Sequence, residues 1–181
     1  MRINKVRIIG GSHRRRLIEF PDAEGLRPTP DRVRETLFNW LGQTLDGRRC
    51  LDLFAGSGAL GFEAASRGAT EVVMVERNRA VFRNLQENIK KLSFQNIALY
   101  NEDGLEFVKQ QNRTFDVIFL DPPFQSEYLP RLLPLLVDNL QTDGIVYVES
   151  GAPFEADASW QVIRQARAGA VFYQLLQYGQ A

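Results

Sequence analysis

The sequence predicts an α/β fold in which helices cover both faces of a mostly parallel sheet. From residue 48 onward, short apolar runs alternate with stretches of helical periodicity, which is typical of strands joined by crossover helices. The apolar runs are hydrophobic on both faces, as expected for strands that are covered on both sides. Only a short link at Ala168-Gly169, followed by Ala170, separates the last two runs. So short a link cannot hold a crossover, so we expect that pair to be antiparallel.

The first 28 residues predict a basic hairpin arm, ahead of a main domain at 29–181. Residues 5–9 and 15–20 have strand character and are joined by Gly10-Gly11-Ser12, which tolerates the positive φ angles of a turn. The chain has no net charge, yet residues 1–16 carry six cations and no acid, so the rest carries −6. Five of the six are arginines, which suit bidentate phosphate contacts. The arm is therefore compatible with a nucleic-acid partner and with an ordinary solvated surface.

A helix is expected to follow this arm. Thr29 is placed to cap it and Pro30 to occupy its first position. Apolar residues then recur every four positions, at Val33, Leu37 and Leu41. This spacing gives the helix one apolar face, so Arg32 and Arg34 are expected to project elsewhere.

The remaining elements follow in regular order. The expected parallel strands are 50–54, 72–76, 97–100, 116–121 and 145–150. The expected helices are 60–67, 81–92, 105–111 and 129–140. The final antiparallel pair is expected at 160–167 and 171–178.

Composition excludes several classes of protein. The chain has one Cys and one His, which excludes a multi-Cys or multi-His zinc site and any internal disulfide. Cys50 is expected to be a small core residue. No stretch approaches the roughly 20 apolar residues of a membrane span, and arginines interrupt the first 20 residues, where a signal peptide would need an apolar run. We therefore expect a cytoplasmic protein with no membrane partner and no metal.

A glycine-rich loop follows the first strand of the main domain. Gly56, Gly58 and Gly61 satisfy the pattern GxGxxG, and Glu76 ends the next strand, where an acid that binds ribose belongs. Taken alone, this pattern indicates a dinucleotide site or simply a turn. Asp52 lies four residues before the first glycine, and its carboxylate would repel a pyrophosphate but attract a ligand with an ammonium and a sulfonium.

A second motif, Asp121-Pro122-Pro123-Phe124, ends the fourth parallel strand. On its own, Asp-Pro-Pro is also explained by a sharp turn after a strand. The motif indicates a binding site because it lies at the carboxyl edge of the sheet, where open α/β sheets bind their ligands.

Together these residues resemble a known family. DLFAGSGALG (52–61), Glu76, Asn101-Glu102-Asp103-Gly104 and DPPF are similar to class I S-adenosylmethionine-dependent methyltransferases that methylate amino groups. The segments RIIGGSHRRR (7–16) and RPTPDRVRETLFNWL (27–41) are similar to the RsmD family. That family methylates the exocyclic N2 of one guanine in 16S rRNA, guanine 966 in the usual rRNA numbering.

The resemblance implies a fold, a cofactor and a partner. The fold is a Rossmann-like, seven-stranded sheet with an antiparallel last strand, which agrees with the expected pair at the C-terminus. The cofactor is S-adenosyl-L-methionine. The partner is 16S rRNA in the small ribosomal subunit or in an assembly intermediate, and a monomer is expected.

The resemblance also implies roles for residues of the cofactor site. Backbone amides near Gly56 and Gly58 would approach the methionine end of the cofactor, which Asp52 would orient. Glu76 would accept hydrogen bonds from both ribose hydroxyls. Asp103 would accept one from the adenine amino group, and the Gly104 amide would face a ring nitrogen. The full set expected to bind the cofactor is Asp52, Phe54, Ala55, Gly56, Ser57, Gly58, Glu76, Arg77, Asp103 and Gly104.

The DPPF motif is assigned to the target amine. The lone pair of a guanine amino group is delocalised into the ring, so acceptors for both N–H groups would localise it and aim it at the methyl group. Asp121 and the Pro122 carbonyl are those acceptors, and Asp121 is also a candidate to take the released proton. Pro123 helps to stiffen the loop, and Phe124 offers a face on which an extruded base can stack. Adenine or cytosine would satisfy the motif equally well.

The residues expected to contact RNA are Arg7, His13, Arg14, Arg15, Arg16, Arg27, Thr29, Arg32 and Arg34. Two alternatives remain open at this point. A DNA adenine-N6 methyltransferase shares the Asp-Pro-Pro-aromatic motif, although the chain has no sizeable insertion that could recognise DNA. A non-catalytic RNA-binding or assembly factor would use only the arm, and Asp121 would not matter to it.

Overall fold

The computed structural model describes residues 2–123 and 127–179. A seven-stranded sheet forms the centre, with the strand order β5-β4-β3-β6-β7-β9-β8. Its strands are β3 (Arg49–Asp52), β4 (Glu71–Val75), β5 (Ile97–Tyr100), β6 (Phe115–Leu120), β7 (Leu140–Ser150), β8 (Trp160–Ala168) and β9 (Val171–Tyr178). The first five are parallel, and β9 runs antiparallel to β7 and to β8. The expected fold class is confirmed.

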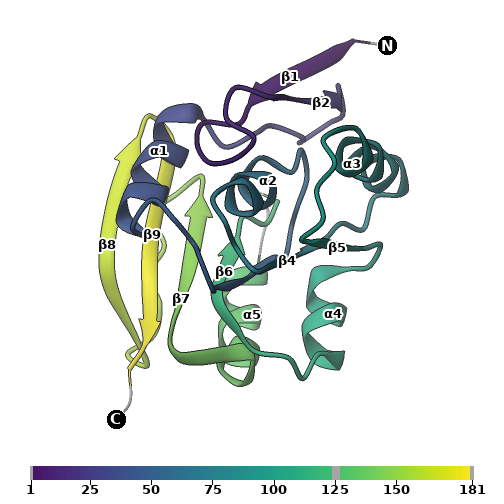
Figure 1. Cartoon of the computed structure of the whole chain (residues 1–181). Helices are drawn as coiled ribbons and strands as arrows, with labels where there is room; N and C mark the ends of the chain where they lie inside the picture. Colours follow the sequence, from purple (N-terminus) through teal and green to yellow (C-terminus); the bar gives the residue numbers. More distant parts are fainter. Residues whose placement is uncertain (1, 124–126, 180–181) are drawn as a thin grey trace.

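Two layers of helices cover the sheet (Figure 1). The helices are α1 (Asp31–Trp40), α2 (Ala59–Ser66), α3 (Arg79–Lys91), α4 (Gly104–Gln110) and α5 (Tyr128–Leu136), with a 3₁₀ turn, η1, at Val137–Asn139. Apolar residues of α1, α2 and α3 belong to one buried cluster, and those of α4 and α5 belong to another. The last helix, α5, is shorter than the expected 129–140. It ends at Leu136, and Leu140 already begins β7.

The order of the strands creates a crevice between β3 and β6. From β3 the chain runs outward through β4 and β5, then returns to place β6 on the other side of β3. At such a point of reversal, the loops that follow the two central strands diverge and leave room for a ligand at their carboxyl ends. The glycine-rich loop follows β3, and Asp121 follows β6. The topology thus brings together two motifs that are more than 60 residues apart.

The N-terminal hairpin consists of β1 (Ile3–Arg7) and β2 (Leu17–Pro21), which pair antiparallel with Val6 opposite Ile18. The hairpin is confirmed, but residues 8–16 connect its strands, so the connection is longer than the expected three-residue turn. Figure 1 shows the hairpin lying across α2 and α3. The division of the chain at residue 28 stays a prediction, since the inner face of the hairpin is already part of the main core.

Hydrogen bonds of backbone and side-chain atoms hold the connection between β1 and β2 against the end of α2. Ser12 N donates to Ser66 O (2.8 Å), His13 N to Ser66 Oγ (2.9 Å), and Ser66 Oγ to Gly10 O (2.6 Å). The chain passes so close here that a Cβ on Gly11, which has φ +79°, would lie 1.8 Å from Ser66 O. Only glycine can occupy that position without moving the backbone.

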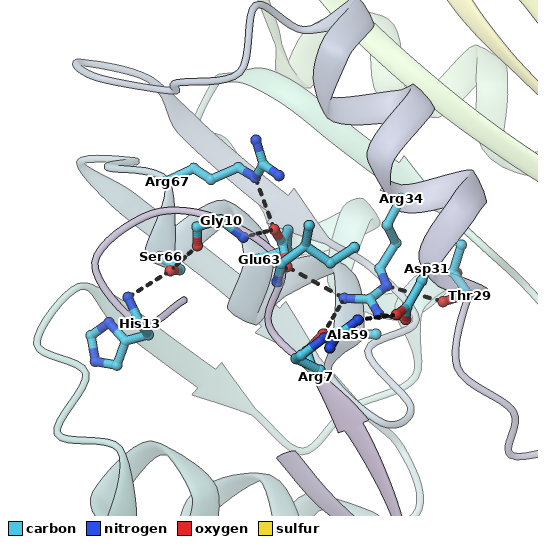
Figure 2. A network of polar contacts seen from close by, with 12 residues as sticks. Arg7, Gly10, His13, Thr29, Asp31, Arg34, Ala59, Glu63, Ser66 and Arg67 are labelled. Carbon is cyan, nitrogen blue, oxygen red and sulfur yellow. Dashed lines mark hydrogen bonds and ion pairs between the residues drawn. The ribbon is translucent and has the colours of Figure 1, made fainter. Parts of the chain in front are cut away.

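A buried acid, Glu63, joins the hairpin to two helices (Figure 2). Its carboxylate accepts from the amides of Ile9 and Gly10, both at 2.9 Å. It also pairs with Arg34 Nη1 at 3.3 Å and Arg67 Nε at 2.9 Å. All eight residues of α2 are buried, so this single acid needs cationic partners inside the protein. The sequence offered that signal, but the pairing was not anticipated.

Arg34 corrects one expectation. Its side chain is fully buried and donates to Thr29 O (3.1 Å) and Arg7 O (2.8 Å), besides its ion pairs with Asp31 and Glu63. The expectation that Arg34 contacts RNA is wrong. The apolar stripe of α1 is wider than a four-residue spacing suggests, because Phe38 is buried as well and lies one turn from Arg34.

The start of α1 corrects another. The N-cap is Pro30, with no side-chain cap, and Thr29 is not the capping residue. The Thr29 hydroxyl instead donates to Glu149 Oε2 at 2.8 Å. Thr29 is 4% exposed, so its place among the residues expected to contact RNA is also wrong. The Thr29 hydroxyl therefore binds the buried carboxylate of Glu149 instead of capping the helix.

Cys50 is buried in the core, as expected, and burial raises the pKa of its thiol to about 12. Among residues 2–123 and 127–179, no helix has the length and apolar character needed to cross a membrane. Within the same residues, no group of three or more His, Cys, Asp or Glu side chains is placed to hold a metal ion.

Candidate active site

A cleft of about 650 Å³ opens at the carboxyl ends of β3, β4 and β6. This is within the range of small-molecule sites, roughly 300–1,000 Å³. It is lined by most of the residues expected there: Asp52, Phe54, Ala55, Gly56, Ser57, Glu76, Arg77, Asp103, Gly104, Asp121, Pro122 and Pro123. Gly58 lies behind the lining, and Phe124 lies outside the described residues.

The glycine-rich loop turns tightly from β3 into α2. Gly56 and Gly58 have φ values of +53° and +86°, and Gly58 is the N-cap of α2. A Cβ on Gly58 would lie 2.4 Å from the Phe62 ring. The Gly56 amide donates to Glu76 Oε2 at 2.8 Å, which ties the loop to the end of β4. The loop therefore presents backbone to the cleft, and the positive φ angles favour glycine at both positions.

Glu76 is held by backbone on both oxygens. Besides the Gly56 contact, Oε1 accepts from Asn78 N at 2.9 Å. Each carboxylate oxygen can accept more than one hydrogen bond, so both oxygens can still accept from a ligand. The side chain is thus oriented in advance at the rim of the cleft.

The wall beyond β5 is made by the start of α4. Asp103 is its N-cap, and Oδ1 accepts from Leu105 N (2.9 Å) and Glu106 N (3.1 Å). The other oxygen, Oδ2, lies 4.0 Å from Arg77 Nη1. A Cβ on Gly104 would come within 2.8 Å of Leu53 O, so this position also requires glycine.

Asp52 is a buried acid at the base of the cleft. Its Oδ2 accepts from Gly61 N at 3.0 Å, while Oδ1 has no hydrogen-bond partner among the described residues. Burial raises its pKa to about 7. The expectation of a permanent carboxylate charge is therefore too simple near neutral pH. A cation in the cleft would restore the charge by favouring the ionised form.

Asp121 comes directly after β6, the strand that pairs with β3. Its side chain is half-buried, and burial together with the negative charge of Glu149 raises its pKa well above the ordinary range. Glu149, in β7, is 7% exposed and also has a raised pKa because it is buried. Sequence reasoning missed Glu149, although an acid that ends an apolar strand beside the Asp-Pro-Pro strand was a visible signal.

The segment between β2 and α1 closes one side of the cleft. Residues 23–30 line it, and the side chain of Leu26 lies over Gly56, with Cδ1 3.2 Å from where a Cβ would stand. Arg27 is exposed and lines the cleft as well. The chain thus runs from the basic hairpin directly across the mouth of the site.

The expected RNA contacts fall into two groups. Arg14, Arg15, Arg16, Arg27 and Arg32 are exposed, and Arg7 is exposed beside Asp31, with 3.4 Å between Nη2 and Oδ2. His13 is different. Its Nε2 lies 2.8 Å from Leu92 O, its Nδ1 lies 2.8 Å from Ser12 Oγ, and its ring stacks on Phe94 at 3.9 Å. Both ring nitrogens have partners within the protein, so the phosphate contact of His13 stays a prediction.

The strand order, the antiparallel β9 and the glycine-rich loop at the crevice define a class I methyltransferase fold. Comparison with known proteins gives the family. Residues 6–177 match the family model described as Conserved hypothetical protein 95. The chain belongs to this family, which is the RsmD family of the sequence resemblance.

Named relatives agree with this assignment. Ribosomal RNA small subunit methyltransferase D of Escherichia coli (strain K12) is 44% identical over 179 residues, which is 96% of this chain and 90% of the relative. The protein of the same name from Haemophilus influenzae is 42% identical over 181 residues, or 96% and 94% of the two chains. A solved structure described as putative methyltransferase yhhF from Escherichia coli has a TM-score of 0.87 at 41% identity, covering 97% of this chain and 98% of the other.

Proposed function

We propose that this protein transfers the methyl group of S-adenosylmethionine to the exocyclic N2 of a guanine in 16S rRNA, in the small subunit or an assembly intermediate. The observation that carries the proposal is that one cleft holds both the glycine-rich loop with Glu76 and Asp103 and, across it, Asp121 and Pro122. A ligand bound along the first set would lie beside the second.

The cofactor fits the residues present. Asp52 lines the cleft, and its buried Oδ1 has no hydrogen-bond partner among the described residues. Gly104 leaves room where a Cβ would strike the backbone. Glu76 is held ready to accept two hydroxyl groups. When bound, S-adenosylmethionine supplies a methyl group on a positively charged sulfur.

Asp121 and the Pro122 carbonyl act on the amine. By accepting a hydrogen bond from each N–H, they would turn the nitrogen lone pair out of conjugation with the ring and toward the methyl group. Pro122 is buried, which limits the movement of its carbonyl. Phe124 stays a prediction as the stacking partner of the base.

Two observations support rRNA as the substrate. The relatives of greatest identity named above are rRNA small subunit methyltransferases. Exposed arginines occur on the hairpin connection, at Arg14, Arg15 and Arg16, and in the lining of the cleft, at Arg27, so positive charge is available to RNA both outside and inside the cleft.

The experiment that tests this function incubates the protein with labelled S-adenosylmethionine and, in separate reactions, with unmodified small subunits, unmodified large subunits and DNA. Mass spectrometry of the product nucleosides should find N2-methylguanosine from the small subunit alone. N6-methyladenine formed in DNA would favour the DNA enzyme instead. RNA binding without any product, independent of cofactor, would favour a non-catalytic factor.

Glu76→Ala is expected to weaken S-adenosylmethionine binding by about 1.5–3 kcal/mol, because the variant can no longer form hydrogen bonds to a charged group. Calorimetry measures the affinity directly. Glu35→Ala removes an exposed acid from α1 and serves as the control, with no expected change. Equal affinities of Glu76→Ala and wild type would remove Glu76 from the cofactor site.

Replacing Arg14, Arg15 and Arg16 together with Ala is expected to reduce the slope of log K against log salt concentration by about 2–3, close to one unit for each phosphate that the arginines no longer neutralise. RNA binding across a salt series measures this slope. The matched control removes three exposed arginines of α5 and β8, namely Arg131, Arg164 and Arg167. An unaltered slope in the hairpin variant would mean that the arm is only a solvated surface.

A further inference from the structure

Asp121 faces a second carboxyl, Glu149, that the proposed mechanism does not use. The two strands pair in parallel, with Leu120 of β6 opposite Val148 of β7, so the next residue of each strand is Asp121 and Glu149. Both side chains line the cleft, and burial together with the charge of Glu149 raises the pKa of Asp121.

A hydrogen bond from Thr29 also orients the Glu149 carboxyl group. Thr29 Oγ1 donates to Glu149 Oε2 at 2.8 Å, and both residues are buried. This contact orients one oxygen toward the segment before α1 and leaves the rest of the carboxyl to Asp121. A residue that only filled space at the end of β7 would not require a buried hydroxyl as a partner.

The charged and titratable groups that act on the pair are Asp52 from β3 and Tyr147 from β7, and Tyr173 of β9 acts in turn on Tyr147. Arg27 and Arg77 line the same cleft, but among the described residues neither forms an ion pair with Asp121 or Glu149. Two carboxylates in contact repel strongly when both are ionised and buried. One shared proton relieves this repulsion, and such a pair then titrates as a unit.

We infer that Glu149 is a positioning residue that holds one proton jointly with Asp121, so that the pair carries a single negative charge and receives the proton released by the methylated amine. The inference rests on the proposed function for its chemical step. It states which groups hold a proton before methyl transfer and which groups accept the proton released afterwards. The roles proposed for the glycine-rich loop and the Asp-Pro-Pro segment do not specify this.

The step balances. The new C–N bond forms as the C–S bond breaks, the electron pair of that bond stays on sulfur, and the positive charge moves to the amine nitrogen. The nitrogen then gives one proton to the pair, which goes from one proton to two and becomes neutral. One positive and one negative charge are thereby cancelled inside the cleft, and a proton later returns from the pair to solvent.

The first test uses the free protein, without cofactor or RNA. Side-chain carboxyl carbons are followed by NMR through a pH titration in wild type, Glu149→Gln and Glu149→Asp. In wild type, Asp121 should titrate well above the ordinary value of about 3.9. Glu149→Gln removes the neighbouring charge and should lower the Asp121 midpoint by about one unit or more. Glu149→Asp keeps a carboxyl and should retain most of the elevation.

The second test follows methyl transfer in a single turnover at saturating cofactor and RNA. Activity should fall on the acid side as the pair gains its second proton, because it can then no longer accept the proton of the amine. In Glu149→Gln, Asp121 accepts that proton alone, so this limb should move from the lower midpoint of the wild-type pair up to the single Asp121 midpoint of the variant, while KM for RNA stays the same. Glu106→Gln, an exposed acid on α4, is the control and should match wild type.

The outcomes separate the two proposals. An ordinary Asp121 midpoint in wild type, or the same midpoint in wild type and Glu149→Gln, overturns the shared proton. Methyl transfer with coincident pH profiles in wild type and Glu149→Gln overturns its role in the step. An elevated Asp121 midpoint in a wild-type protein that methylates no rRNA supports the pair and overturns the proposed function.

Discussion

Asp121→Ala should bind S-adenosylmethionine with the affinity of the wild type yet transfer its methyl group about 10²–10⁴ times more slowly, the usual contribution of a positioned acid or base. The reason is geometric. Asp121 follows β6, whereas the residues assigned to the cofactor follow β3, β4 and β5. The substitution removes an acceptor for the amine and leaves the cofactor site in place.

Calorimetry and single-turnover methyl transfer measure the two quantities separately. Asp138→Ala, which removes an exposed acid in η1, is the matched control and should behave as wild type in both. A variant at Asp121 that methylates at a rate near wild type would show that the amine is held elsewhere.

Glu63→Ala should reduce the free energy of unfolding by about 3–5 kcal/mol, because it removes the buried one of the two acids that pair with Arg34 and leaves this buried cation only the half-exposed Asp31. Two hairpin amides, of Ile9 and Gly10, would lose their acceptor at the same time. Unfolding in urea measures the difference, and the exposed Glu87→Ala should change it by less than about 0.5 kcal/mol.

Glu63→Gln provides an internal check on that result. The amide keeps one acceptor oxygen for the hairpin but loses the charge that pairs with Arg34 and Arg67. It should fall between wild type and Glu63→Ala. A loss below about 1 kcal/mol for Glu63→Ala would mean that water replaces the acid and that the ion network contributes little.

The elements of the sheet could be predicted because its strands are apolar runs and a periodic helix follows each of β3, β4, β5 and β6. The strand 97–100 agrees residue for residue, and the antiparallel pair agrees to within one residue at its ends. The residues around the cleft could also be predicted, since carboxyl ends of parallel strands meet at one edge whatever the lengths of the helices between them.

The sequence did not allow us to predict which polar side chains meet. Arg34 and His13 were expected to contact RNA from their charge and position alone. Their partners, Glu63 and the Leu92 carbonyl, lie 29 and 79 residues away, and the sequence around Arg34 and His13 does not indicate them. The same holds for Glu149 and Thr29, which are 120 residues apart. Polar pairing over such distances is decided by packing of the whole domain.

The contact between Gly11 and the last residue of α2 bears on whether this hairpin can be exchanged between enzymes. The eight residues of α2 form a rod about 12 Å long, with the glycine-rich loop at one end and the seat of the hairpin at the other. Residues 1–28 grafted onto a foreign methyltransferase would find neither Ser66 nor Glu63 to hold them. A working transplant has to carry the outer face of α2 as well, so the unit of exchange is the hairpin together with the helix beneath it.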